Sequence, residues 1–286
     1  MKSRFRLLAV DLDGTLLDPW GRIPKRNREA LLAAERLGVI IVLASGRPPR
    51  DMRAIYHEIG LTTPLVALNG AVILDEHERR ILQHRAITAS TAQRATHIIY
   101  EYGATAFVQL ETQDGYEDCW HVTTADEEFH EALVRRNIAP PRSVGRVDEV
   151  LMDEHVAITK LGFYTTVPAM AAIRTEIRAQ LASEVSLLAF DDTSLSLYAP
   201  GVSKAAGVGW LADCYSISPS QVMAIGDDIN DLELLSWAGH GVAMANSRQA
   251  VLRVAAATTV SNEECGVAEA IERWILNEVE IASVQE

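Results

Sequence analysis

The stretch Val10-Asp11-Leu12-Asp13-Gly14-Thr15-Leu16 decides the expected fold and points to the function. It follows a mainly apolar run, residues 5–10, whose composition is typical of a buried strand. An Asp-Gly turn at the end of a strand explains Gly14 but leaves Asp11 unexplained. Aspartate is depleted in strands, and it is costly near the interior of a sheet unless another group compensates its charge. The two carboxylates therefore indicate a functional site at the end of this strand.

Apolar strands and helices alternate on both sides of a long central block. The expected elements lie at residues 5–10, 24–37, 39–44, 49–59, 65–68, 71–74 and 80–83 before the block, and at 203–214, 222–225, 231–238, 241–244 and 267–276 after it. Apolar runs without alternation predict strands covered on both faces, and the strand-helix order predicts a parallel sheet. We therefore expect an α/β fold whose core is a doubly wound, mostly parallel, Rossmann-like sheet.

The central block has a different order of elements. Helices are expected at residues 90–102, 125–136 and 168–181, and strands at 105–110, 116–121, 156–164, 184–190 and 194–198, with a loop at 137–153. Mixed order with hairpins favours an inserted α+β domain that has an antiparallel sheet. The expected domains are a discontinuous core, residues 1–85 and 196–286, and an insertion, residues 86–195.

Composition limits the class of protein. With 48% hydrophobic and 23% charged residues among 286, the chain is expected to be globular, neither disordered nor embedded in a membrane. Its three cysteines, at positions 119, 214 and 265, are too widely spaced to predict a disulfide framework or a zinc site. The two aspartates interrupt the apolar start too early for an export signal, so the cytoplasm is the expected location. A net charge of −13 argues against a nucleic-acid partner.

Polar residues that suit phosphate chemistry occur where predicted strands end or helices begin. They are Asp11 and Asp13 after the first strand, Ser45-Gly46-Arg47 after the second, Lys204 at the start of a helix, and Gly226 to Asp231 after a later strand. Ligands of open parallel sheets bind at the carboxyl ends of the strands, so we expect these dispersed residues to lie together. A nucleophile, a hydroxyl, a cation and an acid cluster describe a phosphoryl-transfer site.

At these positions the chain resembles the haloacid dehalogenase-like superfamily, and within it the Cof-like phosphatases that carry a large α+β cap. The similar segments occur in family order: DLDGTLLD at 11–18, ASGRP at 44–48, LNGA at 68–71, GVSK at 201–204, GDDIND at 226–231 and GVAMANS at 241–247. The resemblance implies a magnesium-dependent mechanism with an aspartyl phosphate, and it makes the insertion a cap. The chain departs from the family at Ala205, where glycine is usual, and at Asp228-Ile229, where Asn-Glu is more frequent.

The resemblance assigns different roles to the first two aspartates. Asp11 is ionised at neutral pH and is the expected nucleophile toward phosphorus. Asp13 is the expected general acid, which protonates the leaving alkoxide and later deprotonates water. It must hold a proton in the first step, and we expect the nearby carboxylates of Asp11 and Asp227 to favour that proton.

A phosphate dianion needs positive charge to approach these carboxylates. Two like charges 4 Å apart repel by about 4 kcal/mol at an effective dielectric constant of about 20. We expect Mg²⁺ to bind Asp11, the backbone carbonyl of Asp13, and Asp227. The expected phosphate-binding groups are Lys204, Ser45, the backbone amide of Gly46, and Asn230, which resembles the phosphate-contacting amide of the family.

Several residues have two open interpretations. Arg47 would orient either the phosphate or the inserted domain, or form a structural ion pair. Asn69 would touch the substrate or only shape its turn. Asp228 and Asp231 are either metal ligands or helix-capping acids, and we expect Asp231 beside the ligands rather than among them.

The expected function is a cytoplasmic, magnesium-dependent phosphomonoesterase for a small phosphorylated metabolite, such as a sugar phosphate. The first alternative is a phosphomutase, because a related capped family uses the same phosphoaspartate. The second is a phosphorylatable signalling or binding module, since receiver domains also place Asp, a hydroxyl and Lys around magnesium. The residues do not determine the substrate or the oligomeric state.

Overall fold

The chain folds into two compact units in a computed structural model that describes residues 3–112, 118–122, 142–143, 147, 151, 156–189 and 191–277. The first unit consists of Met1–Glu78 and Ser203–Glu286, and the second consists of Arg79–Val202. The sequence placed the limits of an insertion at residues 86 and 195. That the first unit is a catalytic core and the second a cap stays a prediction.

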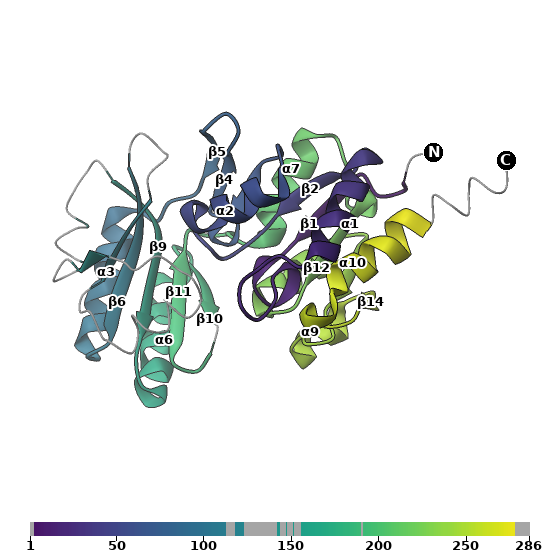
Figure 1. The fold of residues 1–286 in the computed structure, drawn as a ribbon. Coiled ribbons are helices and arrows are strands. Elements are labelled where there is room, and N and C mark those ends of the chain that lie inside the picture. Colours follow the sequence, from purple (N-terminus) through teal and green to yellow (C-terminus); the bar gives the residue numbers. More distant parts are fainter. Residues whose placement is uncertain are drawn as a thin grey trace. The chain divides into compact units, whose positions relative to one another are not determined.

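The first unit is built on a parallel sheet (Figure 1). Within the described residues its order is β14-β13-β12-β1-β2, and every neighbouring pair is parallel. The strands are β1 (Leu7–Val10), β2 (Ile40–Leu43), β12 (Val222–Gly226), β13 (His240–Ala243) and β14 (Ala257–Thr258). A parallel bridge from Ala44 to Val66 continues the sheet toward β3 (Leu65–Ala67), which pairs antiparallel with β4 (Val72–Asp75). This sheet confirms the predicted α/β class.

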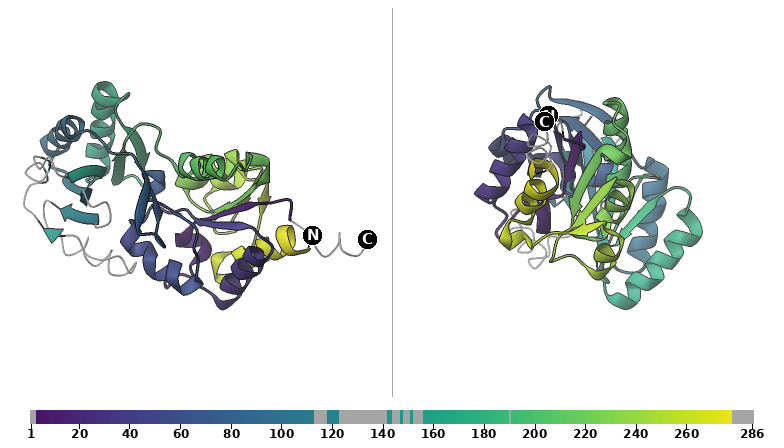
Figure 2. Two further views of the ribbon diagram at one scale, coloured as in Figure 1. Left: turned by 90° about the horizontal axis from the view of Figure 1, so that it is seen from above. Right: turned by 90° about the vertical axis from the view of Figure 1, so that its right-hand side faces the viewer.

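Helices cover both faces of the sheet (Figure 2). They are α1 (Lys25–Arg36), α2 (Pro49–Ile59), α7 (Lys204–Cys214), α8 (Leu232–Trp237), α9 (Gln249–Val254) and α10 (Gly266–Ile271). Helix α1 packs against α10, and α7 packs against α8. The strands β1 and β12 between them are buried along their whole length, which explains their continuous apolar sequences.

The second unit contains a sheet of order β10-β11-β9-β6-β7-β8 within the described residues. Its strands are β6 (Thr105–Thr112), β7 (Asp118–Val122), β8 (Arg142–Ser143), β9 (Val156–Tyr164), β10 (Ser186–Ala189) and β11 (Ser194–Tyr198), preceded in the chain by β5 (Arg80–His84). All neighbours in the sheet are antiparallel except β7 and β8. The helices α3 (Ala89–Glu101) and α6 (Val167–Leu181) contribute to its apolar core. This confirms the α+β insertion; the helix expected at 125–136 lies outside the described residues.

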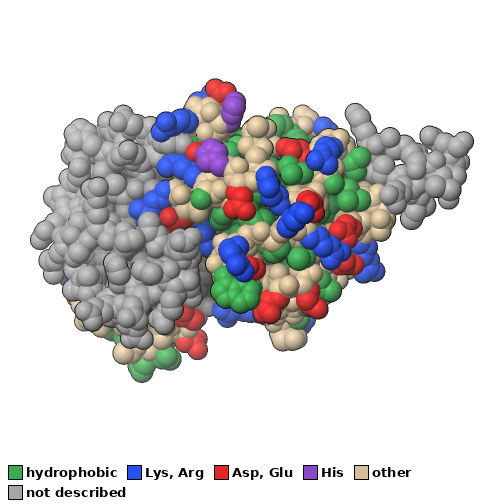
Figure 3. Space-filling view, in the orientation of Figure 1, with side chains coloured by type: hydrophobic (Ala, Val, Ile, Leu, Met, Phe, Trp, Pro, Cys, Tyr) green, Lys and Arg blue, Asp and Glu red, His purple; other side chains and the backbone are tan. Residues whose placement is uncertain are grey.

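Charged side chains of both signs are interspersed on the face of the first unit that Figure 3 shows. A few charged groups are instead buried, among them Asp11, Lys204 and Asp231. Among the described residues, no helix combines the length and the apolar character that crossing a membrane requires. The buried charged residues of the first unit are therefore candidates for a functional site.

Candidate active site

The quoted motif forms a wide turn at the carboxyl end of β1. Residues Leu12–Leu16 make a turn of the π-helical type, in which the N–H of Leu16 donates to the carbonyl of Asp11 at 3.2 Å. Gly14 has φ +76°, and a Cβ at this position would lie 2.3 Å from Oδ2 of Asp227. Glycine is therefore required twice here, for its backbone angle and for the approach of Asp227. Oγ1 of Thr15 donates to Oδ1 of Asp227 at 2.7 Å, so the turn also holds Asp227.

Lys204 is fully buried between two carboxylates. Its Nζ donates to Oδ1 of Asp11 at 2.6 Å and to Oδ1 of Asp231 at 2.7 Å. Ser203 caps helix α7 by accepting a hydrogen bond from the N–H of Ala206, which places Lys204 in the first turn. Burial alone would lower the pKa of Lys204, but Asp11 and Asp231 raise it above its usual value. The ammonium group is therefore charged at neutral pH.

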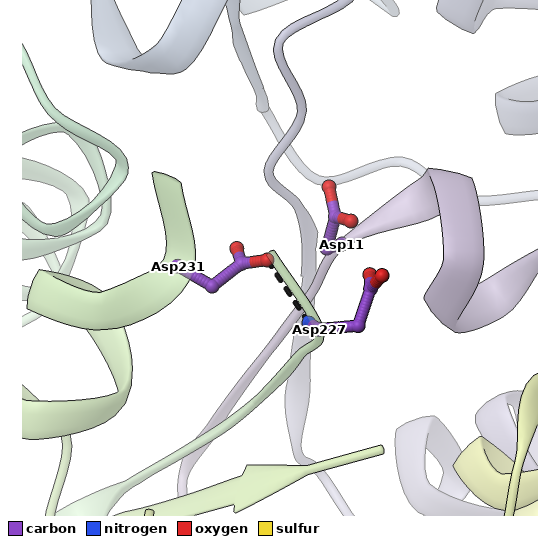
Figure 4. A group of neighbouring side chains, drawn as sticks. All are labelled: Asp11, Asp227 and Asp231. Atoms are coloured by element: carbon purple, nitrogen blue, oxygen red, sulfur yellow. Dashed lines mark hydrogen bonds between the residues drawn. The ribbon is translucent and has the colours of Figure 1, made fainter. Parts of the chain in front are cut away.

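Asp231 joins the lysine to the β12 loop. Figure 4 shows it beside Asp11 and Asp227, and one carboxylate oxygen of each of the three lies within 4.8 Å of the others. Oδ1 of Asp231 accepts from Lys204, and Oδ2 accepts from the N–H groups of Asp227 at 3.1 Å and Asp228 at 3.2 Å. Both oxygens are thus engaged. Whether Asp231 lies beside the metal ligands or among them stays a prediction, because its carboxylate belongs to the same group as those of Asp11 and Asp227.

The cluster holds more carboxyl groups than ammonium groups. Burial raises the pKa of Asp11 well above its usual range, with further increases from Asp231 and Asp227 and an opposing effect from Lys204. Burial likewise raises the pKa of Asp227 to about 6, against the hydrogen bond from Thr15. Among the described residues of this cluster, three carboxylates face one ammonium group. Carboxylate oxygens are preferred ligands of Mg²⁺, so both the donor atoms and the shortage of positive charge fit a divalent cation.

Arg47 binds the predicted general acid. Its Nε donates to Oδ2 of Asp13 at 2.7 Å, and its Nη2 donates to Oδ1 at 2.6 Å. The Arg47 side chain is 6% exposed and that of Asp13 is 58% exposed. We expected neighbouring carboxylates to favour a proton on Asp13. The structure instead pairs Asp13 with the guanidinium group of Arg47.

Ser45, Asn69 and Asn230 line the neighbouring part of the site. The Oγ of Ser45 accepts from the N–H of Arg47 at 3.1 Å, and its carbonyl accepts from the N–H of Asn69 at 2.9 Å. Nδ2 of Asn230 donates to Oδ1 of Asn69 at 2.9 Å, and the Asn69 amide lies 3.3 Å from the position of a Cβ at Gly46. The residues expected to bind phosphate are therefore near one another.

Asn69 sits in a left-handed turn with Leu68 and Gly70, whose φ angles are +49°, +56° and +91° in chain order. Such angles cost non-glycine residues roughly 1–2 kcal/mol each. A Cβ at Gly70 would lie 2.2 Å from the carbonyl oxygen of Ser203, the cap of the helix that carries Lys204. The turn thus both presents Asn69 and packs against the start of α7.

Sequence reasoning missed the partners of two acids. It did not find Thr15 as the partner of Asp227, although Thr15 is part of the quoted motif. It also missed Arg248, whose Nε lies 2.6 Å from Oδ1 of Asp228. Asp228 replaces the asparagine that is more frequent in the family, and this extra carboxylate was a signal that a cation lies nearby.

Comparisons with known proteins point to one family. A family model of the haloacid dehalogenase-like hydrolases matches residues 8–271. The chain is 29% identical to the putative phosphatase YxeH of Bacillus subtilis, over 95% of this chain and 99% of the relative. It is 28% identical to the 5-amino-6-(5-phospho-D-ribitylamino)uracil phosphatase YitU of the same organism, over 96% and 99%.

A solved structure shows the same fold. The haloacid dehalogenase-like hydrolase from B. subtilis superposes with a TM-score of 0.84 at 24% identity, over 94% of this chain and 99% of that chain. The motifs quoted from the sequence lie within the matched residues, and the resemblance that they indicated is confirmed. The chain belongs to the haloacid dehalogenase-like hydrolases.

Proposed function

We propose that the chain is a magnesium-dependent phosphomonoesterase that forms an acyl phosphate on the carboxylate of Asp11. One observation carries the proposal: Lys204 holds Asp11, and Asp227 lies beside it, at the carboxyl ends of adjacent parallel strands. Relatives named as phosphatases support the same reaction class.

Asp11 acts as the nucleophile. In the first step a bond forms between its carboxylate oxygen and phosphorus, and the bond from phosphorus to the leaving alkoxide breaks. Lys204 fixes Oδ1 of Asp11 at 2.6 Å and supplies a positive charge for the phosphate. In the second step water attacks phosphorus, which releases phosphate and restores Asp11.

Asp13 moves the protons. It gives a proton to the leaving alkoxide and accepts one from the attacking water. Its bidentate pair with Arg47 fixes the direction of the carboxylate.

The cation site consists of the Asp11 and Asp227 carboxylates and the backbone carbonyl of Asp13. Mg²⁺ bound there would neutralise charge as the phosphate dianion approaches. Asp231 supports the site through Lys204 and the backbone of the β12 loop. Ser45, the N–H of Gly46 and Asn230 are the proposed donors to the phosphoryl oxygens.

The substrate is a small phosphorylated metabolite such as a sugar phosphate. The relative YitU is named for a phosphorylated ribityl compound, which supports this class. We assign the second unit as the cap that selects the substrate, because the groups proposed to act in the first unit recognise only the phosphate. We assign the cytoplasm as the location. A phosphomutase is the alternative within the same mechanism; it would yield an isomerised sugar phosphate in place of free phosphate.

Asp11→Asn tests the proposal. With p-nitrophenyl phosphate and Mg²⁺, kcat should fall by about a thousandfold or more, because the amide is a poor nucleophile. The matched control is Asp18→Asn, in the same segment but paired with Arg22, which should keep kcat within about twofold. Retained activity in Asp11→Asn, with thermal unfolding showing a folded protein, would refute the mechanism.

A further inference from the structure

The turn that carries Asp11 and Asp13 has carbonyl groups that it cannot satisfy itself. Its wide geometry uses the carbonyls of Asp11 and Leu12 for the N–H groups of Leu16 and Leu17. Backbone carbonyls near a protein interior need hydrogen-bond partners from elsewhere. The source of these partners decides how firmly the turn is held.

Asparagine side chains supply such partners. Among the described residues, three asparagine amides donate to carbonyls of this segment: Asn246 to Gly14 at 2.8 Å, Asn27 to Leu16 at 3.0 Å and Asn262 to Leu17 at 2.8 Å. They come from separate places in the fold, the loop after β13, helix α1 and the turn Asn262–Glu264. The turn is therefore held by hydrogen bonds from three separate segments of the first unit.

Two of these amides also accept a hydrogen bond from the backbone. Oδ1 of Asn246 accepts from the N–H of Asn262 at 3.1 Å, and Oδ1 of Asn27 accepts from the N–H of Ala268 at 2.9 Å. An amide both donates and accepts on a short, uncharged arm, which neither a carboxylate nor an ammonium group does. Each therefore ties the turn to a further segment of the first unit.

Asn246 differs from the other two in what lies next to its bond. The Gly14 carbonyl follows the Asp13 carbonyl by one peptide unit, and Asp227 packs against the Cα of Gly14. Asn27 and Asn262 hold carbonyls two and three residues farther along the chain. A shift of the Gly14 peptide would thus disturb two of the groups assigned to the cation directly, whereas a shift at Leu16 would reach them only through Thr15 and the backbone of Asp11.

The segment that carries Asn246 also contacts the second ligand-bearing loop. The N–H of Met244 donates to the carbonyl of Gly226, and the N–H of Arg248 donates to that of Asp227, both at 3.2 Å. Residues 244–248 therefore contact both the turn after β1, at Gly14, and the loop after β12, at Gly226 and Asp227. Asn246 supplies the bond to the β1 turn.

We propose that Asn246 is a positioning residue for the cation site, which sets the spacing between the Asp13 carbonyl and Asp227, while Asn27 and Asn262 stabilise the fold. This inference rests on the proposed magnesium site. Removing a group that orients metal ligands typically weakens metal binding by about 10- to 100-fold. Asn246 is solvent-exposed, whereas Asn27 and Asn262 are buried, so its replacement leaves no internal cavity.

The test is Mg²⁺ binding without substrate. Isothermal titration of metal-free protein with MgCl₂ should give a Kd about tenfold higher for Asn246→Ala than for the unmodified chain. Thermal unfolding in EDTA should be nearly unchanged. The matched control, Asn27→Ala, removes the same kind of bond at Leu16; it should unfold at a lower temperature while its Kd stays within about twofold. If that variant does not fold, Asn262→Ala takes its place.

The outcomes separate the two proposals. An unchanged Kd in Asn246→Ala, or an equal rise in the Asn27 control, would overturn the positioning role while leaving the proposed function intact. Loss of folding in Asn246→Ala would also overturn it. Absence of Mg²⁺ binding by the unmodified chain would refute the magnesium site itself.

Discussion

The two ends of the parallel sheet in the first unit bury ionisable groups in different ways. At the carboxyl end, Lys204 lies between the carboxylates of Asp11 and Asp231. At the amino end, the His240 ring packs against Phe5 and Trp274, with ring centroids 5.7 and 5.1 Å away. Its Nε2 is buried and has no hydrogen-bond partner among the described residues.

The difference shows how the fold handles charge. Burial, with a further contribution from Arg4, lowers the pKa of His240, so this end of the sheet favours the neutral form of a half-buried imidazole. The carboxyl end pairs Lys204 with two carboxylates, but burial raises the pKa values of Asp11 and Asp227, so ionising all three carboxyl groups creates an excess of negative charge that a cation would neutralise. The two ends should therefore respond in opposite directions to pH, and only the carboxyl end should respond to Mg²⁺.

Removing the cation of the carboxyl end should have the largest effect. Lys204→Met leaves Asp11 and Asp231 buried without their partner, which should cost about 3–5 kcal/mol of unfolding free energy. The control Lys25→Met removes a lysine that is 88% exposed and pairs with Glu29, and its effect should stay below about 0.5 kcal/mol. Urea unfolding at pH 7 measures both. Equal losses of unfolding free energy in Lys204→Met and Lys25→Met would show that the burial of Lys204 between its carboxylates does not contribute to stability.

Asp227 should make the metal-free protein less stable as pH rises. Its folded pKa of about 6 exceeds the value of about 3.9 in an unfolded chain. The protonated carboxyl is thus favoured by folding, and its stabilisation is complete below pH 4 and lost as pH passes through 6. Relative to Asp227→Asn in EDTA, the unmodified chain should lose at most about 3 kcal/mol between pH 4 and 8.

Magnesium provides the control for this pH effect. At pH 8 saturating Mg²⁺ should stabilise the unmodified chain and have little effect on Asp227→Asn. Denaturant unfolding across pH, with and without Mg²⁺, gives both quantities. A difference between the two proteins that does not depend on pH would contradict the raised pKa.

His240 should produce a smaller effect of opposite sign. Because its folded pKa is lowered, the neutral ring stabilises the fold above about pH 6.5, and this contribution is lost as pH falls. Relative to His240→Phe, the unmodified chain should lose stability between pH 7 and 5. His97→Gln, at an exposed position, is the matched control for the loss of a histidine. If the stabilities of the unmodified chain and His240→Phe depend on pH in the same way, the lowered pKa of His240 is contradicted.

The sequence predicted what local patterns determine. Continuous apolar runs indicated β1 and β12, and a serine before a helix indicated the start of α7 at Lys204. The rule that ligands gather at the carboxyl ends of parallel strands then predicted that Asp11, Lys204 and Asp227 lie together. The structure brings them together, while their catalytic roles stay proposals.

Contacts made by long side chains could not be predicted in this way. The pairs of Arg47 with Asp13 and of Arg248 with Asp228 depend on tertiary geometry, which leaves no periodic pattern in the sequence. Helix α9 and strand β14 were missed because six and two residues are too few to show a period. The close packing of Gly207 is another tertiary contact that the sequence does not predict. It packs against Gly70, since a Cβ there would lie 3.0 Å from the Gly70 Cα.

The central claim is that Asp11 becomes phosphorylated during turnover, and chemical trapping tests it most directly. Protein mixed with substrate and Mg²⁺ is quenched in acid and reduced with borohydride, which converts an aspartyl phosphate to homoserine. Peptide mass spectrometry should find homoserine at position 11, dependent on substrate and absent from Asp11→Asn. Rapid turnover without homoserine at position 11, or with homoserine at another aspartate, would contradict the account.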